Sequence, residues 1–270
     1  MSRILCSTGA LIGRPNGRNF RLLSECIGRL ACDGFEFMLY DSWYDRLEEL
    51  EEYFRSLPVR FPCFHVEKRV GELISHGGEE ELTQAFSLFE INCSFASKLS
   101  SELLVLHLWS GLDSDKNIEH NIGAFGRLKE IAERYDLLLT VENVVCNHAD
   151  PMTHMKRLVE VYPDISFTYD TKMAEFHRQL YDITLPESAH LLPHIKHMHI
   201  NDYKGGIKDW SSLRTLPVGE GQIDFARWFH TVREIRYNGD FTVEATVFDA
   251  SGEIHCDMLT RCFRRIKEYI

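Results

Sequence analysis

Short apolar runs alternate with longer amphipathic segments along almost the whole chain, and this alternation is the strongest constraint on the fold. The runs are rich in β-branched and aromatic residues and are four to eight residues long, as expected for buried strands. Strands separated by helices pair in parallel through right-handed crossovers. The predicted strands cover residues 3–8, 34–39, 60–66, 103–108, 137–143, 165–170, 195–200 and 240–246.

The segments between these runs carry apolar residues at helical spacing. Eight parallel strands close into a barrel without an edge strand, and about 250 residues are typical of such a barrel. The 270-residue length therefore favours an α/β fold of the (β/α)₈ barrel type, the TIM barrel. The predicted helices cover residues 20–31, 44–57, 79–99, 122–135, 151–162, 225–235 and 256–270.

An open, doubly wound sheet is the competing α/β fold. It would place a glycine-rich phosphate loop, GxGxxG, between its first strand and the following helix. The corresponding segment, STGALIGRPNG, has no such motif in register with a helix start. No repeat, linker or low-complexity stretch divides the sequence, so we expect a single domain over residues 1–270.

The composition limits the compartment and the partners. No apolar run reaches the roughly 20 residues of a membrane span, and the first residues, MSRILCSTGA, lack the features of a signal peptide. The eight cysteines are scattered without a CxxC motif, which favours reduced, mostly buried thiols and a cytoplasmic protein. A net charge of −11 disfavours nucleic acid, whose binding depends on clustered lysine and arginine.

Four polar residues each end an apolar run in the second half of the chain: Glu142, Asp170, His199 and Glu244. A buried strand has no packing reason to end in a carboxylate. In a barrel, the carboxyl ends of the strands meet at one face, where active sites are built. Three carboxylates and an imidazole suit one divalent ion such as Mn²⁺, Mg²⁺, Co²⁺ or Zn²⁺. Each residue alone could be a structural carboxylate or imidazole, but the set of four favours a metal site.

Other predicted strands also carry polar residues at their ends. His65 ends the third strand and His107 the fourth, while Glu36 lies in the second. We expect Glu36 to close the barrel floor or to orient a neighbour rather than to react. The histidines at 76, 120, 148 and 154 are interpreted as loop or helix-surface residues.

The order of the strand-end motifs resembles the xylose isomerase-like TIM barrels, particularly their sugar phosphate isomerase/epimerase branch. The resemblance covers nearly the whole chain. It implies that Glu142, Asp170, His199 and Glu244 hold one divalent metal and that the protein is an isomerase or epimerase of a sugar or sugar phosphate. The motifs are GFEFM, FHVEKR, LHLWSG, TVENV, TYDT, HMHIND, VGEGQIDF and TVEA.

The chemistry implied is proton transfer next to a metal-chelated carbonyl, with Glu142 and Glu244 as the acid/base pair. The product could be an epimer or an aldose–ketose isomer, and a polyol dehydratase would use a similar mechanism. The candidate contacts with the hydroxyl or phosphate groups of the carbohydrate lie at strand ends or early loops: His65, His107, Lys172, His197 and Lys204. A supporting or packing role is an equal alternative for His197.

Endonuclease IV-like DNA repair enzymes belong to the same superfamily and bind three zinc ions, so they provide the alternative function. His65 and His107 match two of their extra ligands. Their third metal uses a DxxH and a DxH motif, but here Met173 follows Asp170 and Ser211 follows Asp209 at those spacings. Ketose 3-epimerases also place a substrate-binding histidine at the position of Met173. The resemblance therefore does not identify which sugar is the substrate. A non-catalytic metabolite-binding barrel is a third alternative function. The sequence does not decide whether the protein forms a homodimer.

Overall fold

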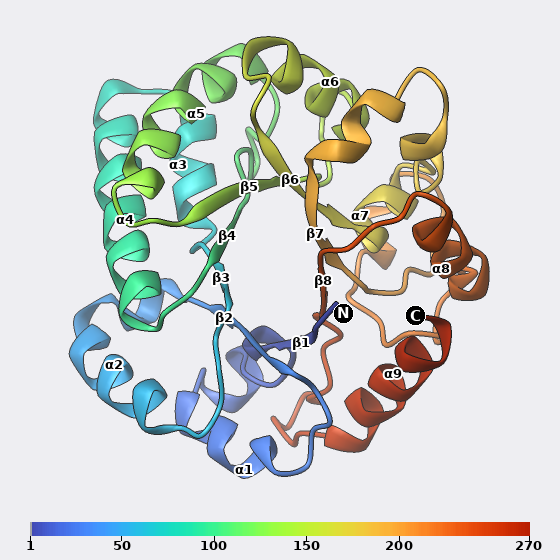
Figure 1. Cartoon of the computed structure of the whole chain (residues 1–270). Helices are drawn as coiled ribbons and strands as arrows, with labels where there is room; N and C mark the ends of the chain where they lie inside the picture. Colours follow the sequence, from blue (N-terminus) through green and yellow to red (C-terminus); the bar gives the residue numbers. More distant parts are fainter. Residues whose placement is uncertain (1) are drawn as a thin grey trace.

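The computed structural model describes residues 2–270, and its centre is a closed barrel of parallel strands paired in sequence order, with β8 next to β1. Figure 1 looks along the barrel and shows the strands surrounded by helices. The α/β (β/α)₈ prediction is therefore confirmed. The strands are β1 (Ile4–Ser7), β2 (Gly34–Met38), β3 (Cys63–His65), β4 (Leu103–Leu106), β5 (Leu138–Glu142), β6 (Ser166–Asp170), β7 (Ile195–His199) and β8 (Asp240–Val243).

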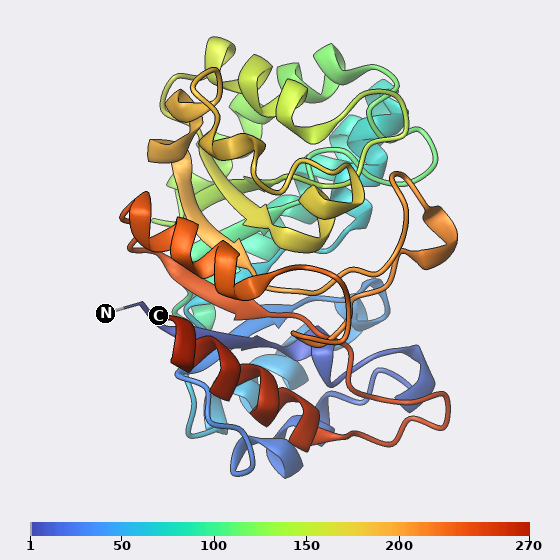
Figure 2. The ribbon, with the colours of Figure 1, turned by 90° about the vertical axis from the view of Figure 1, so that its right-hand side faces the viewer.

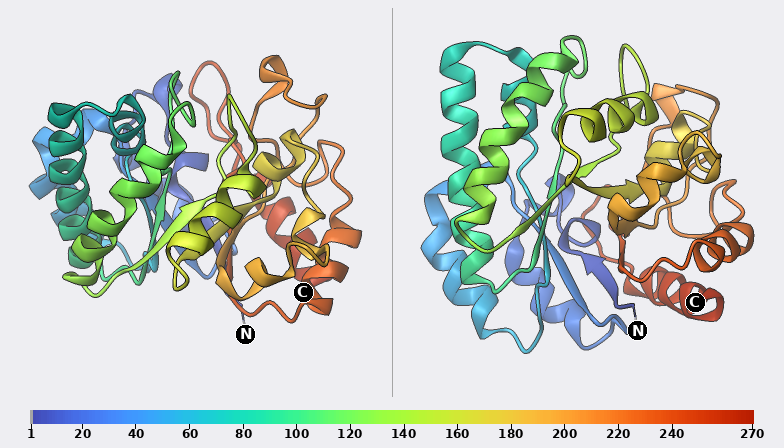
Figure 3. Two further views of the ribbon diagram at one scale, coloured as in Figure 1. Left: turned by 90° about the horizontal axis from the view of Figure 1, so that it is seen from above. Right: turned by 45° about the horizontal axis from the view of Figure 1, so that its top comes forward.

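The α-helices form the outer layer, and Figure 3 shows the long helices running alongside the strands. Several short 3-10 turns complete the connections. The α-helices are α1 (Leu23–Ile27), α2 (Leu47–Ser56), α3 (Arg69–His76), α4 (Glu79–Lys98), α5 (Ile118–Glu133), α6 (Pro151–Val161), α7 (Thr171–Phe176), α8 (Phe225–Glu234) and α9 (Cys256–Tyr269).

All eight predicted strands are present, but some boundaries differ. β3 is shorter than the predicted run over residues 60–66. The helix predicted over residues 20–31 reduces to a 3-10 turn, Phe20–Leu22, followed by α1, which ends at Ile27. Helices α3 and α7 were not predicted. His107 and Glu244 each lie one residue beyond their strand rather than inside it.

The outer face of the barrel is apolar and packs against the helices. Around Phe37 of β2, the rings of Phe54, Phe64 and Phe95 lie with centroids 4.7, 5.2 and 5.4 Å away. All four side chains are buried. Burying one such ring contributes about 1.5–3 kcal/mol, so this strand–helix layer supplies much of the stability.

The inner face of the barrel is mostly polar. Threonine hydroxyls of neighbouring strands meet there, with 2.7 Å between Thr140 Oγ1 and Thr168 Oγ1. Leu5, Cys63 and Val105 form a small apolar cluster that is separate from the outer core. Polar side chains therefore fill the space that aliphatic layers occupy in many barrels.

β7 contains one extra residue relative to β6. Phe167 pairs with Ile195, but the next residue, Thr168, pairs with His197, so that Lys196 has no partner in this register. Beyond this bulge, Asp170 stands opposite His199. The irregularity aligns the ends of β6 and β7 so that their last side chains face each other.

The two faces of the barrel differ. Figure 2 shows both termini at one end and the strand arrows pointing to the other, where the longest loops emerge. These loops follow the carboxyl ends of the strands, the face that carries active sites in this fold. No helix within residues 2–270 combines the length and apolarity needed to cross a membrane.

Candidate metal centre

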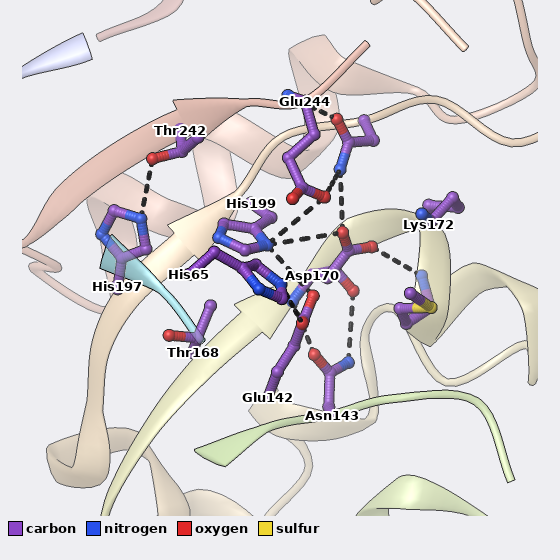
Figure 4. Close-up of polar contacts among 12 residues, drawn as sticks. His65, Glu142, Asn143, Thr168, Asp170, Lys172, His197, His199, Thr242 and Glu244 are labelled. Atoms are coloured by element: carbon purple, nitrogen blue, oxygen red, sulfur yellow. Dashed lines mark hydrogen bonds and ion pairs between the residues drawn. The ribbon is translucent and has the colours of Figure 1, made fainter. Parts of the chain in front are cut away.

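The four expected ligands come together at the carboxyl ends of neighbouring strands. Glu142, Asp170 and His199 are the last residues of β5, β6 and β7, and Glu244 follows β8 directly. Each of the four offers one ligand atom, and these atoms all lie within 4.8 Å of one another. The prediction that these residues converge is therefore met by the geometry, as Figure 4 shows.

His199 lies at the centre of this group. Its Nδ1 atom is 3.0 Å from Glu142 Oε1, 3.5 Å from Glu244 Oε2 and 3.9 Å from Asp170 Oδ2. Ligand atoms around a divalent ion at about 2.0–2.2 Å are separated by comparable distances. The arrangement thus has the size of a coordination shell.

The site concentrates negative charge inside the protein. Burial raises the pKa of Asp170 to about 6, and the carboxylates of Glu142 and Glu244 act in the same direction against the cation of Lys172. Burial would also raise the pKa of Glu142, but the adjacent His107 and His199 outweigh it and hold that pKa well below its usual range. A group of carboxylates that resists full ionisation is stabilised by a bound cation.

His199 carries the matching positive charge. Burial would lower its pKa, but the carboxylates of Glu244, Glu36 and Glu142 outweigh burial and raise that pKa well above the usual range. An imidazolium here occupies the position of a cation among the carboxylates. Its Nδ1 proton must leave before that nitrogen can ligate a metal.

Two asparagines that the sequence analysis did not single out hold the ligands. Asn201 donates from Nδ2 to Asp170 Oδ2 (2.8 Å) and to Glu244 Oε2 (3.2 Å), and its Oδ1 accepts from the Glu244 backbone N–H. Asn143 Oδ1 accepts from the Asp170 backbone N–H. Both asparagines lie in the motifs TVEN and HIND, one or two residues after a ligand, and that polar residue beyond a strand end was the available signal.

The second oxygen of Asp170 has a structural role. Oδ1 accepts the backbone N–H of Met173 at 2.7 Å, so that Asp170 caps the first turn of α7. The carboxylate is therefore fixed on both sides, by α7 and by Asn201. Met173 contributes its backbone N–H here.

His65 and His107 both face Glu142. Nε2 of His107 lies 2.6 Å and Nε2 of His65 lies 3.6 Å from Glu142 Oε2. Burial lowers the pKa of His107 to about 4, against the opposite effect of the Glu142 carboxylate. Glu142 Oε2 accepts no well-aligned hydrogen bond within residues 2–270, although it is buried. One carboxylate oxygen is thus left available for a cation or a proton.

The remaining predicted contacts differ in position. Lys172 is buried at the edge of the centre and donates from Nζ to Thr215 Oγ1 at 3.0 Å. Figure 4 shows its ammonium on the side of Asp170. His197 lies deeper in the barrel, 2.9 Å from Thr242 Oγ1, which favours the supporting role over a substrate contact. Lys204 is exposed on the loop after β7.

The donor set fits a divalent metal. It offers oxygen atoms from three carboxylates and one imidazole nitrogen, the combination used for Mn²⁺, Co²⁺, Zn²⁺ and similar ions. Glu142 Oε2, which accepts no well-aligned hydrogen bond within residues 2–270, and the clustered carboxylates are the features that a bound cation would satisfy. The ligands available thus agree with the metal that the sequence resemblance implies.

Asp209 and Met173, which stand at the positions compared with the repair-enzyme motifs, make local contacts. Asp209 is partly exposed and its carboxylate caps the turn at Trp210–Ser212, accepting from the hydroxyls of Ser211 and Ser212 at 2.6 Å each. Met173 contacts Asp170 through its backbone N–H rather than a ligand side chain. Asp209 and Met173 thus make local hydrogen bonds at the turns that they begin or enter.

Residues 27–255 match the family model of the xylose isomerase-like TIM barrel. The chain belongs to this family. It is 27% identical over 167 residues to the uncharacterized protein MJ1311 of Methanocaldococcus jannaschii, an alignment that covers 55% of this chain and 52% of the relative. The aligned part of the chain therefore spans about half the length of this curated relative.

Solved structures of sugar epimerases share the fold of this family member. D-allulose 3-epimerase from Methylomonas sp. superposes with a TM-score of 0.72 at 14% identity, covering 100% of this chain and 97% of the epimerase. The IolI protein with a bound zinc atom also gives 0.72, at 16% identity, covering 99% of this chain and 97% of IolI. At these identities the likeness establishes the fold alone.

Proposed function

We propose that this protein is a divalent-metal-dependent isomerase or epimerase that acts on a sugar or sugar phosphate. The observation that carries the proposal is the convergence of Glu142, Asp170, His199 and Glu244 at the carboxyl face of the barrel. The sugar epimerases among the solved structures with this fold, and the zinc in IolI, support the same kind of chemistry. The ion is one Mn²⁺, Mg²⁺, Co²⁺ or Zn²⁺ per chain.

The metal, when bound, polarises the carbonyl of a hydroxy-carbonyl sugar and acidifies the neighbouring C–H bond. Glu142 and Glu244 then move the proton. They approach His199 from different strands, with Glu142 at the end of β5 and Glu244 after β8. A pair of carboxylates on different sides of one substrate can remove a proton and return it to either face or to the adjacent carbon.

The environments of the two glutamates suit different parts of this cycle. Glu142 is fully buried, with Oε2 free of a well-aligned bond among the described residues, whereas the Glu244 side chain is 10% exposed. A buried carboxylate exchanges its proton with the substrate rather than with water, and a partly exposed one can re-equilibrate with solvent. We therefore expect Glu244 to exchange its proton with water faster than Glu142.

Lys172 is proposed to hold a substrate oxygen. Its ammonium is buried and makes one hydrogen bond, to Thr215, which leaves donor capacity unused among the described residues. Buried lysines are almost always paired. An enediolate, carboxylate or phosphate oxygen of the substrate would provide the missing acceptor. His65, His107 and the more exposed Lys204 are the other proposed contacts, and His197 is the least favoured.

Metal content is the first test of this proposal. Asp170→Ala and His199→Ala should each lower metal occupancy sharply while the barrel stays folded, because each removes one ligand atom from the shared centre. Asp209→Ala, on the exposed turn, is the matched control and should keep its metal. Elemental analysis of dialysed protein gives the stoichiometry. Unchanged occupancy in both ligand variants would remove the site.

The kind of chemistry is tested by solvent-deuterium exchange. The metal-loaded protein should incorporate deuterium into a ketose, an aldose or one of their phosphates, because proton return to carbon leaves solvent deuterium in the product. It should not nick duplex DNA with an abasic site at physiological salt. Efficient cleavage would favour the endonuclease IV-like alternative, which the proximity of His65 and His107 to Glu142 keeps open.

The proposal also covers the setting of the enzyme. The eight cysteines are free thiols, which supports a cytoplasmic location. The substrate is a small carbohydrate, with no nucleic acid or membrane partner and with a homodimer left open. Loss of water from a cyclic polyol is the alternative reaction at the same centre, and formation of a dehydrated product in the same assay would identify it.

A further inference from the structure

Glu36 is a buried carboxylate beneath the metal centre that the proposed reaction does not use. It lies in the middle of β2, has no exposed surface, and its Oε2 atom has three neighbours with N–H or S–H groups. These are His199 Nε2 at 3.0 Å, Cys63 Sγ at 3.1 Å and His197 Nε2 at 3.2 Å. An interior charge with this many donors requires an explanation, because burying a carboxylate is costly.

The two ring nitrogens of His199 face different carboxylates. Nδ1 points to the ligands Glu142, Asp170 and Glu244, whereas Nε2 points away from them to Glu36. An ionised carboxylate only accepts hydrogen bonds, so the contact with Glu36 requires a proton on Nε2. The nitrogen that faces the ligands is then the one that can lose its proton and offer a lone pair.

We propose that Glu36 is a positioning residue that fixes the N–H of His199 at Nε2 and thereby presents Nδ1 to the metal. This inference rests on the proposed metal centre and goes beyond it, because it assigns Glu36 a role that acts through His199. Metal-binding histidines are commonly held by a carboxylate on the other ring nitrogen, which fixes the tautomer and the ring orientation. Without Glu36, the neutral imidazole could carry its proton on Nδ1 or rotate.

Glu36 is itself held in place from two further strands. The Cys63 thiol on β3 donates to Oε2, and His197 on β7 links Glu36 to Thr242 on β8, 2.9 Å away. Strands β3 and β7 therefore supply the neighbours of Glu36 Oε2, and Thr242 on β8 contacts the same nitrogen of His197. His197, which the sequence analysis placed among the substrate contacts, belongs to this interior support.

The test measures metal affinity in Glu36→Gln and Glu36→Ala. Equilibrium dialysis with Co²⁺ alone should show roughly 10–100-fold weaker binding for Ala, the range found when such supporting groups are removed. Gln should lie between Ala and the wild type, because its amide oxygen still accepts the N–H but carries no charge. Glu67→Gln is the matched control, since Glu67 is another buried glutamate and its carboxylate contacts Tyr44 and the Arg69 backbone N–H rather than one of the proposed ligands.

Folding is separated from positioning by measuring unfolding of the metal-free proteins. Affinity is compared only at a temperature where all variants are folded, so a lower stability alone leaves the binding constant of the native state unchanged. Co²⁺ binding equal to the wild type in both Glu36 variants would overturn the proposal. A second Co²⁺ ion that Cys63→Ser abolishes would also overturn it, because Glu36 would then be a ligand.

Histidine NMR gives a readout independent of affinity. In the zinc-loaded protein labelled with ¹⁵N-histidine, His199 should carry its proton on Nε2 and bind zinc through Nδ1, and the Glu36→Ala variant should lose this single state. A proton on Nδ1 in the wild type would refute the assignment. Wild-type protein that binds no metal would instead refute the metal centre itself, so the two failures are distinguishable.

Discussion

Asp115 lies on the loop after β4 and holds the loop that follows Glu142. Its Oδ1 accepts the backbone N–H groups of Asn147 and His148 at 2.7 and 3.0 Å, and its Oδ2 accepts that of Ala149 at 2.7 Å. His154 on α6 adds a fourth contact at 2.9 Å. Both side chains are buried. One carboxylate thus fixes three consecutive residues of the β5–α6 loop.

We predict that Asp115→Asn destabilises the protein by about 3 kcal/mol. Each carboxylate oxygen takes two of the four contacts, so replacing either oxygen by an NH₂ group breaks two of them. A hydrogen bond to a charged group contributes about 1.5 kcal/mol or more. With an unfolding entropy of about 2.1 cal/mol/K per residue, this loss corresponds to roughly 5 °C in Tm.

The assay is urea unfolding followed by circular dichroism, with Asp113→Asn as the control. Asp113 is two residues away, is partly exposed, and has its nearest charged partners, His76 and Lys116, 3.8 Å distant. Its substitution should change stability by less than about 0.5 kcal/mol. Equal, small effects of the two substitutions would refute the inference that the hydrogen bonds of Asp115 hold the loop.

The difference in stability between wild type and Asp115→Asn should depend on pH, in a direction that follows from the pKa of Asp115. Burial would raise the pKa of Asp115, but His154 and the three backbone N–H groups outweigh burial and lower that pKa far below its usual value. A carboxyl with a depressed folded-state pKa adds stability above its unfolded pKa of about 3.9 and loses that stability as the pH falls toward the folded value. The difference between wild type and Asp115→Asn should hold from pH 7 to about 4 and shrink below that.

Three further predictions follow from the site and its support. Glu142→Asp and Glu244→Asp should keep part of the metal but lower kcat about 100-fold, because a displacement of roughly 1 Å misplaces the carboxylate. If steady-state turnover stays near normal in both variants, Lys172 or His107 becomes the candidate that carries the proton. Gly71→Ala should lower the urea midpoint, because its Cβ would lie 1.9 Å from the His107 carbonyl oxygen, whereas Gly123→Ala on α5 meets nothing within 4 Å and should raise it. Metal at 100 times its Kd should stabilise the protein by about 2.7 kcal/mol, measured by comparing thermal unfolding with metal and with chelator. The His199→Ala variant should show no such difference.

The strands could be predicted because their signal is local. Each is a short apolar run, and eight of them separated by helical segments leave few topologies to consider. Helices α3 and α7 are short, with eight and six residues, and α7 begins on the Asp170 side chain as its cap. Such helices depend on tertiary contacts more than on their own periodicity, so the sequence does not reveal them.

The ligands could be proposed because parallel strands bring their ends to one face whatever the exact register. The supporting contacts depend on details that the sequence leaves open. The link from Glu36 to His199 joins residues 163 positions apart. The interpretation of His154 as a loop or helix-surface residue is wrong, because its side chain is buried against Asp115 and Trp109. Nothing in the spacing of α6 marked this histidine, since its partner lies on another loop.

The bulge in β7 determines which insertions and deletions this strand can accept. Lys196 is the residue that has no partner in the register with β6, and its side chain is exposed. Deleting it would join Ile195 to His197 in regular alternation and leave His199 opposite Asp170. Inserting one residue between His197 and His199 would turn one of the two histidines to the outer face. The strand should therefore tolerate a shortening at Lys196 and no lengthening beyond it, an asymmetry that paired deletion and insertion variants assayed for Co²⁺ binding can measure.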